Sequence, residues 1–157
     1  MKILLITEDE VSYEVLNEVA SLSDSQVIWL KTLSEAKDFL NTNNDIHAII
    51  ASEKLSDGSS LQILALIKKN PSLSGTPFVI IANEPTQEEI EYYKTLGVIE
   101  VFEIPFNPLE VFLIITNYIK DTKGEEVVKE ILEEPKKEKK SILAKIIGFF
   151  KKIFGKG

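Results

Sequence analysis

The sequence contains no cysteine, no arginine and only one histidine, His47. Without cysteine, the chain forms neither a disulfide framework nor a thiolate metal site. Glycine-rich phosphate-binding loops are also absent, and so is a basic, aromatic-rich pattern of the kind that binds nucleic acid. No signal peptide precedes the first apolar run, which indicates a cytoplasmic protein. We therefore expect no cofactor and no nucleic-acid partner.

The 157 residues, of which 44% are hydrophobic, suffice for one domain with a substantial core and an appendage. Five strand-like apolar runs alternate with helical patterns, and this alternation predicts a parallel sheet between two layers of helices. The strands are expected at 2–7, 26–31, 47–52, 77–82 and 99–103. The helices are expected at 8–21, 33–41, 59–70, 86–96 and 108–120. The predicted fold class is therefore an α/β, three-layer (βα)5 sandwich.

The segment 46–64 (IHAIIASEKLSDGSSLQIL) combines an apolar strand, a small polar residue at the strand end and a Gly/Asp turn. It resembles the phosphorylation segment of bacterial receiver domains, and it keeps their turn at Asp57–Gly58. Ser52 stands where that family has its phosphorylated aspartate, and Ser56 stands where it has proline. The resemblance covers residues 1–120. It implies a receiver/flavodoxin-like sheet order of 2-1-3-4-5 and a role in bacterial two-component signal transduction.

Other positions that carry receiver chemistry are also changed. Receivers end their first strand with two acids that hold Mg²⁺, and this chain has Thr7 and Glu8 there. The fourth strand of a receiver ends with a Ser or Thr that binds the phosphoryl group, and here it ends with Ala82. The lysine that receivers carry before a Pro-Phe pair is replaced by Ile104. The resemblance thus implies a degenerate site, that is, a pseudo-receiver.

Phosphoryl transfer needs a nucleophile, a metal and cationic stabilisation of the developing charge. The Ser52 hydroxyl is too weakly acidic to attack unaided, and His47 at the other end of the same strand is too distant to act as its base. The aromatic switch residue of receivers is also replaced, by Val101. We expect the side chains of Ala82 and Ile104 to pack together and fill the space where the strand ends meet. The protein is therefore not expected to be an enzyme.

Two features allow a second interpretation. We interpret Ser52 as a structural residue that ends a strand and caps the next turn, and alternatively as the acceptor for a Ser/Thr kinase. We interpret Glu8, Asp9 and Glu10 as acids favoured at the start of a helix, and alternatively as oxygen ligands of a divalent cation. The structural interpretation is favoured in both cases, so no metal site is expected.

The chain changes character after residue 120. A short acidic helix is predicted at 125–134, with Val127, Val128, Ile131 and Leu132 on one face. Pro135 then indicates the end of this helix, and the lysine-rich run at 136–140 indicates a solvated linker. Residues 1–135 hold 10 lysines and 24 acidic residues, a net charge of −14, whereas residues 136–157 hold 8 lysines and one acid, a net charge of +7.

The last 17 residues, 141–157, have the pattern of a basic amphipathic helix. On a helical projection, the apolar stripe consists of Ile142, Leu143, Ile146, Ile147, Phe149, Phe150, Ile153 and Phe154. The opposite face carries Lys145, Lys151, Lys152 and Lys156. A bilayer span needs about 20 apolar residues, so this pattern instead favours a helix lying on an anionic membrane surface. Docking into a partner groove, or packing on the chain's own domain or on the 127–131 face, are the alternatives.

Three segments are therefore predicted: a pseudo-receiver domain at 1–120, an acidic helix and Lys-rich linker at 121–140, and a basic amphipathic helix at 141–157. We interpret the chain as a phosphorylation-independent signalling adaptor, peripherally attached to the inner face of the cytoplasmic membrane. The resemblance implies a protein partner at 86–120, and the sequence leaves a homodimer open. The alternative is a response-regulator-like switch that uses Ser52 phosphorylation, a metal or a small ligand as input, with its C-terminal helix docking into a partner protein.

Overall fold

A computed structural model describes residues 1–132 of this chain. The lysine-rich run and the amphipathic helix predicted at 136–157 lie outside the described residues. Within residues 1–132, none of the helices is both long and apolar enough to cross a bilayer.

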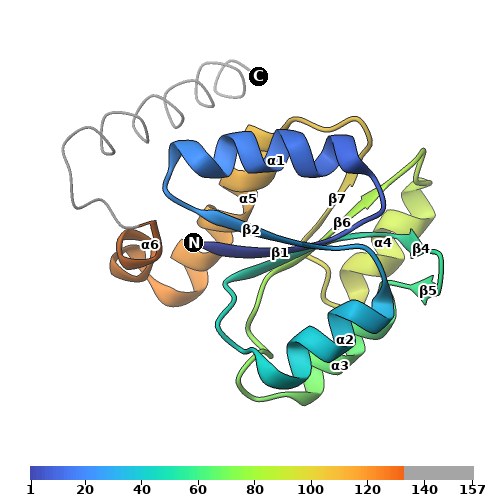
Figure 1. Ribbon diagram of the computed structural model, residues 1–157, viewed down its shortest axis with the longest axis horizontal. Coiled ribbons are helices and arrows are strands. Elements are labelled where there is room, and N and C mark those ends of the chain that lie inside the picture. The colour runs from blue at the N-terminus through green and yellow to red at the C-terminus, as the bar shows by residue number, and fades with distance from the viewer. Residues whose placement is uncertain (133–157) are drawn as a thin grey trace.

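A five-stranded parallel sheet forms the centre of the fold (Figure 1). Its strands are β1 (Lys2–Ile6), β2 (Gln26–Leu30), β3 (Ala48–Ser52), β6 (Phe78–Ala82) and β7 (Glu100–Glu103). They lie in the order β2-β1-β3-β6-β7, and every neighbouring pair is parallel. Counted along the chain, this is the order 2-1-3-4-5. The predicted fold class is therefore confirmed, and each strand begins and ends within one residue of its prediction.

Helices cover both faces of the sheet. They are α1 (Glu10–Leu22), α2 (Leu33–Thr42), α3 (Leu61–Lys69), α4 (Gln87–Thr95), α5 (Pro108–Lys123) and α6 (Glu125–Leu132). Figure 1 shows α1 and α5 over one face of the sheet and α2 and α3 over the other. The three layers follow from the short connections, because each helix packs back on the sheet next to the strand that precedes it.

Two hydrophobic cores form because side chains alternate along each buried strand. In β1, Leu4 and Ile6 belong to the core under α2 and α3, whereas Ile3 and Leu5 belong to the core under α1 and α5. All four side chains are essentially inaccessible to solvent. A continuous apolar run is therefore required of the strand, since neither of its faces meets water.

A small hairpin interrupts the connection between β3 and α3. Its strands are β4 (Lys54–Leu55) and β5 (Gly58–Ser59), and because of it the helix predicted from residue 59 begins at Leu61. Gly58 has a φ of +142°, and a Cβ added there would lie 2.8 Å from Leu33 Cδ1, so the turn requires glycine. The neighbouring Asp57 carboxylate accepts hydrogen bonds from the Leu33 and Ser34 amides, which lower its pKa and attach the hairpin to the start of α2.

Helix α6 packs on the core shared by α1 and α5. Val127, Val128 and Ile131 contact this core, and Leu132 is only 6% exposed. The ammonium group of Met1 donates a hydrogen bond of 2.6 Å to the Ile131 carbonyl, which ties the end of α6 to the start of β1. The apolar face of α6 is thus already occupied, so it is not available to pair with the amphipathic segment. The predicted domain boundary at residue 120 stays a prediction, because contact alone does not show which residues fold together.

Candidate functional site

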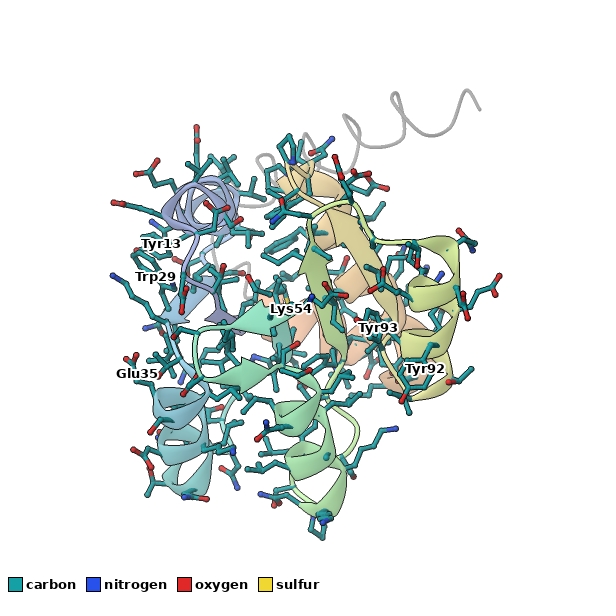
Figure 2. The ribbon with its side chains drawn as sticks, turned by 90° about the vertical axis from the view of Figure 1, so that its right-hand side faces the viewer. Tyr13, Trp29, Glu35, Lys54, Tyr92 and Tyr93 are labelled. Atoms are coloured by element: carbon teal, nitrogen blue, oxygen red, sulfur yellow. The ribbon has the colours of Figure 1, made fainter. Side chains whose placement is uncertain are left out.

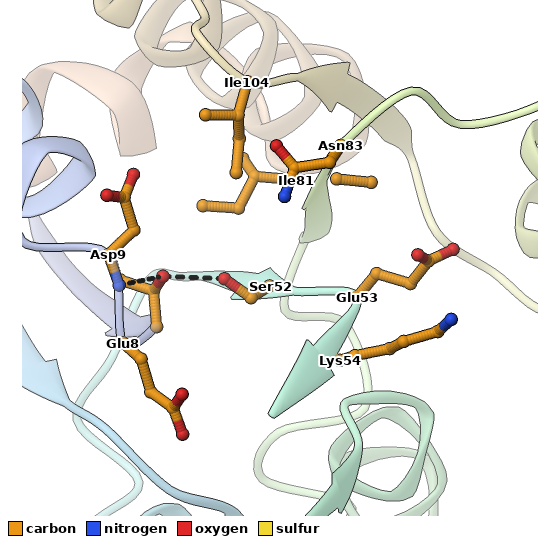
Figure 3. Close-up of a pocket in the computed structure, with 10 residues that line it drawn as sticks. Glu8, Asp9, Ser52, Glu53, Lys54, Ile81, Asn83 and Ile104 are labelled. Carbon is orange, nitrogen blue, oxygen red and sulfur yellow. Dashed lines mark hydrogen bonds between the residues drawn. The ribbon is translucent and has the colours of Figure 1, made fainter. Parts of the chain in front are cut away.

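A cavity of about 500 Å³ opens at the edge of the sheet where the parallel strands end (Figure 3). Its lining comes from four strand ends and from the loops that follow them: Thr7, Glu8, Asp9, Ser52, Glu53, Lys54, Ile81, Ala82, Asn83 and Ile104. All five degenerate positions named from the sequence, Thr7, Glu8, Ser52, Ala82 and Ile104, therefore meet in one place. Val101, the position of the receiver switch residue, is instead buried in the core beside Ile80.

The two hydroxyl groups at the base of the cavity bind each other. Thr7 Oγ1 and Ser52 Oγ lie 2.6 Å apart, and Thr7 is fully buried. Thr7 Oγ1 also accepts a hydrogen bond of 3.0 Å from the Asp9 amide. The Ser52 hydroxyl is thus paired across the sheet with β1 rather than with the following turn, which corrects the predicted capping role. The pair occupies the place where a receiver would bring together its phosphorylated aspartate and a metal-binding acid.

Trp29 and Tyr13 support the end of β1 that carries Thr7. The indole Nε1 of Trp29 donates a hydrogen bond of 2.9 Å to the Thr7 carbonyl. Tyr13 of α1 lies beside Trp29 (Figure 2). Its ring stacks on the indole ring at a centroid distance of 4.4 Å, and Lys31 Nζ lies 4.9 Å from the indole centroid. These contacts hold the backbone of the buried Thr7 in position.

The acids at the start of α1 are engaged locally. Asp9 is the N-cap residue of α1, because its carboxylate accepts hydrogen bonds from the amide and hydroxyl of Ser12. Glu8 Oε1 accepts a hydrogen bond of 3.0 Å from the Ser56 amide, and the hydrogen bonds from Ser56 lower the pKa of Glu8. Across residues 1–132, no group of three or more His, Asp or Glu side chains is arranged to hold a metal ion. The interpretation of Asp9 as an acid at the start of a helix therefore agrees with its role as N-cap residue. Helix α1 itself begins at Glu10, two residues later than predicted.

Sequence reasoning missed three polar residues of the cavity: Glu53, Lys54 and Asn83. The Tyr93 hydroxyl, from α4, donates a hydrogen bond to the Glu53 carboxylate. Burial and this bond raise the pKa of Tyr93. The signal that could have identified these residues was their position directly after β3 and β6, since the ends of parallel strands meet at one edge of the sheet. Lys54 also lines this cavity, although not at the position where receivers carry their lysine.

The expectation that Ala82 and Ile104 fill the meeting point is wrong. Together with Ile81 they form the apolar side of the cavity, and the polar side consists of Glu8, Asp9, Glu53, Lys54 and Asn83. The aliphatic side chains of Ile81, Ala82 and Ile104 therefore line the space between the strand ends without closing it. Chemically, the cavity offers charged groups, an amide and an apolar wall, but Ala82 and Ile104 bring neither the hydroxyl nor the amine of a phosphoryl site.

His47 lies at the opposite end of β3 from Ser52, so no Ser-His pair forms. Its Nδ1 atom accepts a hydrogen bond of 2.9 Å from the Lys2 amide, between β3 and β1. Burial is the main cause that lowers the pKa of His47, and the positive charges of the N-terminus, Lys123 and Lys2 lower it further, whereas Asp45 opposes them. His47 is therefore a structural acceptor that favours the neutral imidazole.

We expect the domain to lose stability as the pH falls from about 6.5, the unfolded pKa of histidine, towards 5. The unfolded chain binds the proton more readily than the folded one, because the folded pKa of His47 is lowered. One proton limits the slope to about 1.4 kcal/mol per pH unit. Urea denaturation at pH 7.5, 6.5 and 5.5 measures the free energy of unfolding and therefore this slope. The control is His47→Asn, whose Oδ1 accepts the same bond without titrating. An equal slope in this variant would contradict the assignment.

No protein-family model matches the sequence, and no curated protein matches it. Solved structures do match. The non-phosphorylated receiver domain of HemR from Leptospira biflexa has 27% sequence identity and a TM-score of 0.65, covering 79% of this chain and 98% of that chain. The signal receiver domain of a putative Luxo repressor protein from Vibrio parahaemolyticus has 19% identity and a TM-score of 0.70, covering 82% and 96%. A response regulator receiver domain protein from Clostridium thermocellum has 20% identity and a TM-score of 0.67, covering 78% and 96%. The chain thus has a receiver-like fold.

Proposed function

We propose that this chain is a phosphorylation-independent signalling adaptor, a pseudo-receiver that works by binding other molecules rather than by catalysis. The observation that carries the proposal is the pair formed by Ser52 and Thr7 at the position of receiver phosphorylation. An aspartate there would be both nucleophile and metal ligand, whereas this chain has two neutral hydroxyl groups bonded to each other. The neighbouring Ala82 and Ile104 add no polar group. The receiver-like fold supports a role in signal transduction.

Incubation of the full chain with acetyl phosphate and Mg²⁺ is expected to leave its mass unchanged. Phosphoryl transfer depends on positioned charge, and this chain has Ser52, Ala82 and Ile104 at the positions of the receiver aspartate, hydroxyl and lysine. Intact-mass spectrometry makes the measurement, with an aspartate-containing receiver treated in parallel as the positive control. The variant Ser52→Asp should also stay unmodified, since Ala82 and Ile104 remain. A stable phosphoryl adduct on the unaltered chain would overturn the proposal.

The second part of the proposal is reversible attachment to an anionic membrane surface through residues 141–157. Near such a surface each lysine contributes about 1 kcal/mol. Eight large apolar side chains that are even half-buried contribute roughly 6 to 12 kcal/mol before the ordering of the segment is subtracted. A net charge of +7 in residues 136–157 attracts this end of the chain to anionic lipid, although residues 1–135 carry −14. The segment would bring the adaptor to the inner face of the membrane.

The proposed protein partner binds the face formed by α4, β7 and α5. Tyr92 of α4 is 56% exposed, and it is one of the few large hydrophobic side chains exposed within residues 1–132. Aromatic side chains are enriched at interfaces because they combine a large contact area with a polar group. Tyr92 is adjacent to Tyr93, whose hydroxyl reaches Glu53 at the cavity. A partner on this face would therefore contact the helix that also touches the degenerate site.

The open cavity favours a second candidate function, a switch that responds to an input other than aspartate phosphorylation. A volume of about 500 Å³ accommodates a small polar molecule, and Glu53, Lys54 and Asn83 offer charged and amide contacts to it. A Ser52 phosphorylated by a kinase, or a metal held by the acids, would use the same space. Native mass spectrometry of the chain isolated from its own cells distinguishes the two functions, because a bound small molecule or a phosphate on Ser52 would favour the switch.

A further inference from the structure

The solvent-facing side of α1 carries acidic residues that lack cationic partners. Glu10, Glu14 and Glu18 follow one another at intervals of four residues, so they form a row along the helix. All three are exposed, and none of them is in an ion pair with another residue of 1–132. The helix itself contains no lysine. A row of uncompensated carboxylates along a full helix attracts a cationic segment.

An apolar strip runs beside this acidic row. Val11 is 61% exposed, Leu22 is 44% exposed, and Val15 between them is half-buried. At 100° per residue, the three side chains lie within about 40° of one another on the helix. We call the two rows together, Glu10, Val11, Glu14, Val15, Glu18 and Leu22, the α1 surface. An apolar strip flanked by carboxylates is complementary to a helix with an apolar stripe flanked by lysines.

The residues predicted at 141–157 have this complementary composition. Their stripe contains only Ile, Leu and Phe, and at 100° per residue the four lysines of the opposite face project within about 60° of the edges of the stripe. The charges of the two parts of the chain are opposite, because residues 1–132 contain 10 lysines and 22 acids, a net of −12, against +7 for residues 136–157. The face of α6 that could have competed for the segment is already packed on the core.

The length of the chain also permits the contact. Residues 1–132 end at Leu132, which shares a hydrophobic core with Val19 of α1. Figure 1 shows α6 on the same side of the molecule as the C-terminal end of α1. Eight residues, 133–140, separate Leu132 from the segment, and they span up to about 26 Å when extended. As helices, α1 and the stripe 142–154 would each be about 20 Å long.

We propose that the α1 surface binds residues 141–157 of the same chain, and that anionic membrane competes with α1 for this segment. The inference rests on the proposed membrane attachment and adds its regulation. Because the segment would start near the C-terminal end of α1, it would run antiparallel to that helix. Lys145 would then lie near Glu18, and the later lysines would lie near Glu14 and Glu10. The domain would cover the phenylalanines of the segment until a membrane displaces it.

Carbodiimide cross-linking without lipid tests the docking, because it joins a carboxylate to an amine only when the two are in contact. In the dilute full chain, we expect cross-links between Glu10, Glu14 or Glu18 and lysines of 141–157, recovered by mass spectrometry from the monomer band. Absence of these cross-links would overturn the proposal. Their appearance only in covalent dimers would assign the surface to a second copy and would also overturn it.

Charge reversal tests the competition. The variant Glu14→Lys/Glu18→Lys should lose the remaining cross-links to α1 and bind anionic vesicles roughly fivefold more tightly than the matched control Glu88→Lys/Glu91→Lys. The control changes the net charge equally, at exposed positions of α4. Equal vesicle binding by both variants would overturn the competition. Failure of the membrane proposal would look different, since the unaltered chain would then keep its cross-links and bind no vesicles in any form.

Discussion

The full chain is expected to sediment with vesicles that contain anionic lipid, and a chain that ends after Pro135 is expected to remain in solution. The truncation removes 8 lysines and the whole predicted apolar stripe, and it leaves a chain of net charge −14 that anionic lipid repels. All residues of the described fold, 1–132, are retained. Co-sedimentation over a range of lipid concentrations measures the difference, which should exceed tenfold in apparent affinity.

A matched variant separates apolar insertion from charge attraction. Replacing Phe149, Phe150 and Phe154 by serine keeps every lysine, and it should weaken binding at least tenfold, because three half-buried aromatic side chains contribute roughly 3 kcal/mol. Added salt and neutral lipid should each weaken binding of the unaltered chain. Binding by the truncated chain, or no binding by the full chain, would contradict the membrane proposal. The segment would then be assigned to a protein groove.

Replacement of Leu132 by alanine should lower the free energy of unfolding by about 2 to 4 kcal/mol. Leu132 is 6% exposed and closes the core formed with Met1 and Val19, and removing a buried leucine loses both its burial and the packing around it. Urea denaturation of residues 1–135, followed by the fluorescence of Trp29, makes the measurement. A loss of this size would show that α6 is an integral part of the domain.

The control for this prediction lies on the same helix. Lys129 is exposed, so Lys129→Ala should change the free energy of unfolding by no more than about 0.5 kcal/mol. A neutral Leu132→Ala would instead support a domain that ends at residue 120, with α6 as a weakly attached extension. The outcome bears on the proposed membrane attachment through residues 141–157. A firmly packed α6 would hold Leu132, after which the chain continues towards these residues, at a fixed position beside the sheet.

Packing of α6 on the core and docking of residues 141–157 on the α1 surface would both bring the C-terminal part of the chain against its N-terminal part. Ile131 is bound by the ammonium of Met1, and α1 shares a core with Leu132. The proposed partner surface on α4, β7 and α5 includes none of the residues of the α1 surface. The membrane segment and the partner surface could therefore be used at the same time, as an adaptor requires.

The sequence alone was sufficient for the layers and the strands of the sheet, whereas the strand order came from the resemblance to receiver domains. Each strand is a short apolar run between helical patterns, and burial of both faces of a parallel sheet demands such runs. The sequence also predicted which receiver groups are missing from the site, because Ala82 and Ile104 contribute no hydroxyl or amine wherever they lie. Asp9 was readable as an acid at the start of a helix, since this signal depends on neighbouring residues only.

Tertiary structure decided every contact between residues distant in the sequence. Thr7 meets Ser52, Ser56 meets Glu8, and Tyr93 meets Glu53 across 40 residues or more. The tertiary structure also decided whether the space between the strand ends is filled or open. The volume of that space depends on how the strands and loops pack around it, and not on side-chain type alone. Periodicity reports which face of an element is buried, whereas the partner of each polar side chain depends on the packing of the whole fold.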